Sequence, residues 1–204
     1  MSYEIHKLTY SEGRPYRYRI TDAAGDVCYE AEPTGIFLPD PNRLVTLLDT
    51  EQHPVGRIEP SPSPPWQWTR EFKLLVGEEE ELCAMIEERW TLVNRILLQL
   101  PSYSIQIGDQ EYTARGTRYG ERFYEVFQPP TEEESIEDEE LSEEEIPEKL
   151  ASQARSRWGE KVGEVLRPPA GANYVVKAEG AALRQAPLVL AALAILADMH
   201  LHGE

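Results

Sequence analysis

The sequence is poor in cysteine, in basic side chains and in long apolar runs. Its 204 residues include two cysteines and 20 lysines and arginines, against 37 aspartates and glutamates, so the formal net charge is −17. This is the wrong charge for nucleic acid or anionic membrane as a general partner. Cys28 and Cys83 lack the CxxC spacing of zinc and redox sites. We expect both to be reduced, small buried residues of a cytoplasmic protein.

No residue pattern typical of an active site is present. The four histidines are scattered, and neither a Gly-x-Ser-x-Gly motif nor a glycine-rich phosphate loop occurs. His200 and His202 are two residues apart, so they would point to different sides of a helix, and we expect them at a solvated helix end. Residues 137–140 lack the alternating oxygen ligands and central glycine of an EF-hand. We therefore expect no catalytic residue, no metal site and no cofactor.

The longest apolar run, residues 187–197, has eleven residues, whereas a transmembrane helix needs about 20. Arg184 and Asp198 flank it closely. The run has no polar face, so a helix here must be buried on all sides. Its six large aliphatic side chains would contribute about 9–18 kcal/mol of gross burial energy. We predict one central helix over about residues 181–202, with Pro187 tolerated near its first turn.

Most of the remaining chain has the alternating pattern of β-strands joined by short turns. In residues 16–20, Tyr18 and Ile20 would face one side of a sheet, and Arg17 and Arg19 the other. Prolines in residues 60–65 predict a loop outside the sheet. The expected strands are residues 3–10, 16–20, 27–32, 44–48, 54–58, 72–76, 103–107, 110–115, 122–128, 161–165 and 174–178.

Residues 79–100 are compatible with two structures. Leu82, Ile86 and Trp90 begin a series of apolar residues at helical spacing, with acids early and Pro101 as a stop. On this pattern alone the segment would be one amphipathic helix. The alternative is a strand hairpin with residues 72–76.

One segment carries most of the negative charge. Residues 131–148 contain eleven acidic residues and no basic one, so −11 of the total of −17 lies there and the rest of the chain carries −6. A block of like charge repels itself and is usually disordered. Residues 146–158 have apolar side chains four apart and predict a short helix at its end.

Two parts of the chain are similar to each other. Residues 54–58 (PVGRI) correspond to residues 161–165 (KVGEV), and residues 16–20 (YRYRI) correspond to residues 103–107 (YSIQI). A duplicated antiparallel β unit followed by one apolar helix suggests strands closed into a barrel around that helix.

This series of motifs resembles the LURP-one-related and phospholipid scramblase-like proteins, which share the fold of the tubby C-terminal domain. The residues that carry the likeness are 18–25 (YRITDAAG), 47–58 (LLDTEQHPVGRI), 101–105 (PSYSI), 162–165 (VGEV) and the helix over 188–201.

The resemblance implies one domain over residues 1–204, a closed antiparallel barrel of about twelve strands with the C-terminal helix through its centre. The first β repeat would cover about residues 1–100 and the second about 101–180, with an acidic insertion at 129–158. The resemblance also implies a strand hairpin of residues 72–76 with 82–87, and we adopt this prediction over the helix.

For function, we expect a non-enzymatic interaction module whose acidic insertion binds a basic protein partner. Because tubby domains bind phosphoinositides through basic residues, the resemblance also implies an alternative, peripheral binding of anionic membrane lipid through an arginine-bearing barrel face. No residue can be matched to the family's lipid site, and the sequence leaves the oligomeric state open. The candidate lipid contacts are Arg17, Arg19, Arg115, Arg118 and Arg122.

Overall fold

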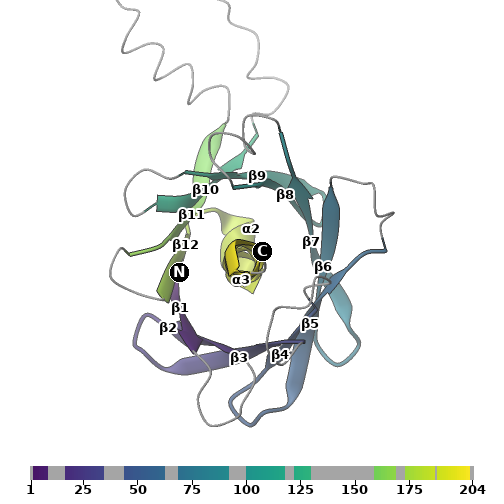
Figure 1. Cartoon of the computed structure of the whole chain (residues 1–204), viewed down its shortest axis with the longest axis vertical. Coiled ribbons are helices and arrows are strands. Elements are labelled where there is room, and N and C mark those ends of the chain that lie inside the picture. The colour runs from purple at the N-terminus through teal and green to yellow at the C-terminus, as the bar shows by residue number, and fades with distance from the viewer. Residues whose placement is uncertain are drawn as a thin grey trace, which may run out of the picture.

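A computed structural model describes residues 2–8, 17–34, 44–62, 69–91, 100–117, 122–129, 159–168, 173–186 and 188–202. Within them, twelve antiparallel strands close into one barrel around a C-terminal helix (Figure 1). Strands adjacent in sequence are adjacent in the barrel, which closes where β1 pairs with β12. The strands are β1 (Ser2–Leu8), β2 (Arg17–Asp22), β3 (Val27–Pro33), β4 (Val45–Leu48), β5 (Pro54–Pro60), β6 (Arg70–Val76), β7 (Glu81–Arg89), β8 (Ser102–Ile107), β9 (Gln110–Gly116), β10 (Arg122–Gln128), β11 (Glu160–Leu166) and β12 (Asn173–Ala178).

The predicted β-barrel is confirmed, and so is the hairpin of β6 with β7, in which Phe72 pairs with Ile86. The helix suggested by pattern alone is wrong for the residues of β7. A spacing of four residues suits both the helical period and the two-residue period of a strand, so it does not distinguish them. A register shift beside Cys83 leaves Leu82 54% exposed. Residues 92–99 lie outside the described part of the chain.

The barrel interior is filled by the inward side chains of the strands and by helix α3 (Leu188–His202), which lies at the centre in Figure 1. Tyr18 and Ile20 point inward and are fully buried, as the alternation of β2 predicts. Every residue from Val189 to Ala197 is at most 1% exposed. The prediction of a buried central helix is therefore confirmed.

The C-terminal helix is divided, which corrects the prediction of one helix over residues 181–202. A short helix α2 (Ala181–Gln185) comes before α3, and Ala186 between them has φ −116° and ψ 62°. Proline 187 has no N–H to donate, and a proline disfavours helical geometry at the residue before it. Pro187 itself lies outside the described residues.

Two smaller expectations are also corrected. Pro60 belongs to the sheet, opposite Phe72, because a proline is tolerated at a strand end, where its missing N–H is not needed. Cys28 and Cys83 are free thiols that are only partly buried.

The acidic insertion enters the barrel wall at one point. Gln128 at the end of β10 pairs with Glu160 at the start of β11, and residues 130–158 between them lie outside the described part of the chain, together with the predicted short helix. Gly159 has φ +80°, and a Cβ there would lie 1.8 Å from the Gln128 carbonyl oxygen. A glycine is therefore required where the chain returns to the barrel. None of the described helices is long and apolar enough to span a bilayer.

Candidate functional site

The two arginines predicted to share a face of β2 do so, on the outside of the barrel, but each contacts a carboxylate from β3. The Arg17 guanidinium lies 3.2 Å from Glu30 and 3.1 Å from Glu32, and the Arg19 guanidinium lies 3.4 Å from Glu30. The Gln52 side-chain amide also donates to Glu30, at 3.1 Å. Two cations and two anions meet here, so the cluster has no formal net charge.

Glu30 is the centre of this outer cluster. Burial alone would raise the pKa of its carboxyl, but hydrogen bonds from Gln52, Arg17 and Arg19 outweigh burial, and the pKa is lowered. The carboxylate is thus ionised at neutral pH. An anionic ligand would have to replace Glu30 as the partner of these arginines.

The remaining predicted contacts do not join this cluster. Arg115 is exposed on β9, opposite Glu125 of β10, and four strands (β1, β12, β11 and β10) lie between β9 and β2. Arg122 begins β10 opposite Leu166, and its side chain is outside the described set, as is all of Arg118. The five arginines therefore do not form one described patch.

Lysines on the neighbouring wall are paired in the same way. The Lys161 ammonium lies 2.6 Å from Glu164 and 3.4 Å from Glu125, and the Lys177 ammonium lies 2.9 Å from Glu164. Burial would raise the pKa of Glu164, but the two lysines outweigh it and lower the pKa. Ion pairs within β11 and between β11 and its neighbouring strands thus neutralise the charge of these two lysines.

A second carboxylate cluster lies inside the barrel, at the C-terminal end of α3. Asp198 is 1% exposed and accepts hydrogen bonds from the hydroxyls of Tyr18 at 2.7 Å and Tyr174 at 2.5 Å. The Lys7 ammonium lies 2.9 Å from the same carboxylate. Asp198 flanks the apolar run in sequence, and the structure places it in the core as well. Its cost of desolvation is offset by one cation and two donors.

The opposite side of the same helix end also carries polar groups. The Trp90 indole N–H donates to the buried Glu88 carboxylate at 2.9 Å, and the Trp90 and His200 rings have centroids 4.9 Å apart. His200 is therefore not at a solvated helix end but is half-buried against Trp90. Among the described residues, no group of three or more His, Cys, Asp or Glu side chains could hold a metal ion.

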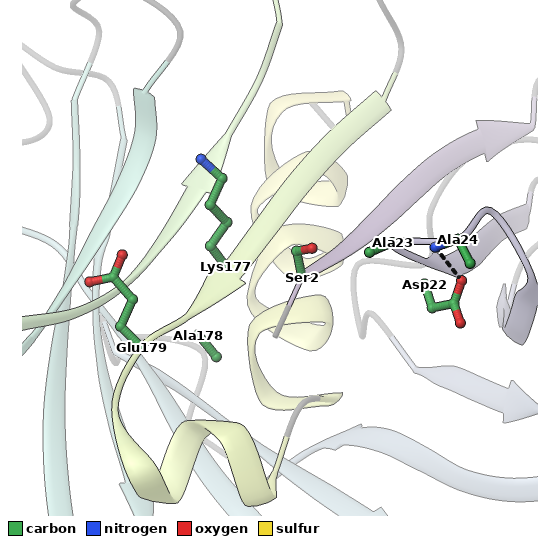
Figure 2. Close-up of a pocket in the computed structure, with 7 residues that line it drawn as sticks. All are labelled: Ser2, Asp22, Ala23, Ala24, Lys177, Ala178 and Glu179. Carbon is green, nitrogen blue, oxygen red and sulfur yellow. Dashed lines mark hydrogen bonds between the residues drawn. The ribbon is translucent and has the colours of Figure 1, made fainter.

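A shallow cleft of about 630 Å³ lies on the surface between the start of β1, the β2–β3 turn and the end of β12 (Figure 2). Its lining includes Lys177, which pairs with Glu164, and Asp22, which accepts hydrogen bonds from two backbone N–H groups of its own turn. Figure 2 shows Glu179 turned away from the Asp22 side of the cleft. The side chains do not converge on one point, so the cleft has no evident ligand.

Glu30 and Asp198 were both missed as organising residues by reasoning from sequence. For Glu30 a signal existed: Glu30 and Glu32 alternate on β3 as Arg17 and Arg19 do on β2, which predicts cross-strand ion pairs once the hairpin is assumed. For Asp198 there was no local signal, because Tyr18 is 180 residues away in sequence.

No family model and no curated protein matches this sequence. Among solved structures, the chain is similar to the X-ray structure of a protein from Arabidopsis thaliana. The two are 13% identical, with a TM-score of 0.49, over 97% of this chain and 90% of the other. An identity this low says nothing about what either protein binds.

Proposed function

We propose that this protein is a non-enzymatic interaction module of the LURP-one-related or scramblase-like type. In this proposal the barrel is the scaffold, and the acidic insertion at residues 129–158 binds a basic protein partner. The placement of the insertion carries the proposal, because eleven acidic residues are inserted between two strand ends that pair with each other, Gln128 and Glu160.

The filled interior supports the proposal that this protein binds its partner on the outside of the barrel. Ligand-binding barrels of this kind need a lumen, whereas here α3 occupies the centre, and the side chains of Val189–Ala197 are buried against the wall. Interior polar groups of the Asp198 cluster are engaged with one another.

The charge distribution supports a basic partner. Residues 131–148 hold −11 of the net charge of −17. The cations of β2 and β11 are paired with glutamates of the wall itself, so they do not offset this charge. A concentrated negative field speeds association with a basic protein and does so less at high salt.

The test compares three proteins as bait in extracts of the native host. The first is the full chain, and the second is a variant in which a short Gly-Ser turn replaces residues 131–157. The third is a full-length variant with the eleven acidic residues changed to Gln or Asn. We expect the full chain to retain basic proteins in a salt-sensitive manner, and both variants to lose them. The paired ends at Gln128 and Glu160 predict that both variants keep the melting temperature of the barrel. Equal retention of the same proteins by all three would contradict the proposal.

The alternative, binding of anionic membrane lipid, makes a different prediction. It would require Arg17 and Arg19 to exchange Glu30 for a lipid phosphate. Flotation with vesicles of phosphatidylcholine containing phosphoinositide, at low salt, would then carry the full chain, and Arg17→Gln/Arg19→Gln would abolish flotation. We expect no flotation of either protein.

A further inference from the structure

The apolar residues of α3 do little to favour one rotation of the helix inside the barrel over another. Residues Leu188–Ala197 are alanine and aliphatic residues on every side of the helix. Burial of apolar surface is non-directional and scales with area. A helix turned or shifted by one residue would bury similar side chains, and cores of the right volume lose uniqueness of packing before they lose stability.

Directional contacts occur at the C-terminal end of α3 and reach two different parts of the wall. Asp198 contacts Lys7 of β1, Tyr18 of β2 and Tyr174 of β12. Two residues further on, His200 lies against Trp90, which follows β7. These two helix positions are about 200° apart around the axis, so they face different parts of the barrel wall.

A shift of register would be costly at this end of the helix alone. Moving α3 by one residue would rotate it by about 100° and translate it by about 1.5 Å. Asp198 would then leave the Lys7 ammonium and both tyrosine hydroxyls while remaining buried. A buried carboxylate without partners is strongly unfavourable, whereas the apolar side chains of the helix body would find other apolar neighbours.

We propose that Asp198, Lys7, Tyr18 and Tyr174 set the rotational and axial register of α3, and that they contribute selectivity among packings rather than net stability. Buried ion pairs are often no more stabilising than apolar residues of the same volume, and their best-attested use is to specify register. The position of the group fits this use, because it joins the helix to β1 and β12, the strands that close the barrel.

The test replaces both charges at once, in the full-length variant Lys7→Met/Asp198→Leu, so that no unpaired charge is left. The reporter is the Trp90–His200 contact, followed by NMR as the cross-peak between the indole and the imidazole, with Trp90→Phe to assign the indole signal. We expect the variant to unfold cooperatively with a melting temperature within about 5 °C of the parent. We also expect its Trp90 indole to give more than one signal, with the cross-peak reduced about twofold or more as registers mix.

The matched control is Arg57→Met/Glu59→Leu, which removes the ion pairs of Arg57 with Glu59 at 3.1 Å and with Glu80 at 3.0 Å on the outer wall. It should keep one Trp90 signal and the full cross-peak. Lys7→Gln/Asp198→Leu, which also removes both charges and keeps a polar group at the partly exposed position 7, should behave like the first double variant and decides the test if that variant does not fold. A single Trp90 signal with the full cross-peak in either folded variant overturns the proposal. So does loss of folding in both, because the group would then supply stability rather than register.

Discussion

One acidic residue on the outer face of the barrel wall and one on the central helix each contact several partners. Outside, Glu30 receives hydrogen bonds from Arg17 and Arg19 of β2 and from Gln52 in the turn between β4 and β5. Inside, Asp198 receives them from Tyr18 and Tyr174 and pairs with a lysine. The outer group joins neighbouring strands, whereas the inner group joins the strands to the central helix.

The two clusters therefore differ in role: the interior residues stabilise the barrel, whereas the exterior residues are accessible to a binding partner. The interior has little exposed surface and stabilises the fold through the burial of apolar side chains. An unpaired charge placed there would be strongly destabilising. The exterior is solvated, and its ion pairs each contribute modestly. A change of the same chemical type should therefore have very different effects on the two faces.

The largest effect is expected from a charge placed in the body of α3. Leu193 is fully buried, so Leu193→Asp would bury a carboxylate with no cation beside it in the apolar helix body. The cost would match or exceed the about 5–15 kcal/mol of stability that a domain has in total. We expect no cooperative thermal transition by circular dichroism.

Two variants make this measurement specific. Leu82→Asp places the same charge on the outer wall, where Leu82 is 54% exposed, and should change the free energy of unfolding by about 0.5 kcal/mol or less. Leu193→Ala should fold but lose about 2–5 kcal/mol, as other buried Leu→Ala changes do. A folded Leu193→Asp with the melting temperature of Leu82→Asp would show that α3 is not in the core.

A smaller effect is expected from Glu30→Gln, which removes the charge at the centre of the outer cluster. At pH 7 we expect a loss of about 1–3 kcal/mol, because hydrogen bonds to charged groups are lost and two arginines are left with fewer partners. Urea denaturation of both proteins gives the difference directly.

The same variant gives a dependence on pH whose sign is fixed by the lowered pKa of Glu30. A carboxyl whose pKa is lower in the folded state contributes stability above its unfolded pKa of about 4.3 and loses it as the pH falls through the folded value. The difference between parent and Glu30→Gln should therefore shrink below about pH 4. Glu51→Gln, at an exposed position, should show no difference at either pH. A constant difference at pH 7 and pH 3 would contradict the pairing of Glu30.

The strands could be predicted from sequence because each one has alternating side chains between turn residues. The two-residue turn at Gly108 and the hairpin turn at Gly25, both with positive φ, are examples. Closure into a barrel was suggested by the duplicated β unit and the apolar helix, and the number of about twelve strands came from the family resemblance. Pro187 was expected to be tolerated near the first turn of one helix, and the division into α2 and α3 was not predicted. The internal repeat stays a prediction.

The polar clusters were harder to predict because they depend on partners from distant parts of the chain. The alternation of β2 predicted that Arg17 and Arg19 share one face of the sheet. Their pairing with a carboxylate depends on Glu30, which lies on the same outer face of the next strand. The surroundings of Asp198 depend on barrel closure, which brings β1, β2 and β12 to one end of α3. An acidic residue beside an apolar run looks the same in sequence whether it ends the helix in water or is buried with partners.

Hydrogen exchange of the α3 amides tests most directly whether the barrel is built around this helix. If it is, the amides of Val189–Ala197 exchange only when the whole domain unfolds. Their exchange free energy should then equal the free energy of unfolding from urea denaturation to within about 1 kcal/mol. Exchange of these amides at a much lower free energy, while the amides of β6 and β7 stay protected, would mean that the helix leaves an intact barrel and would contradict the account.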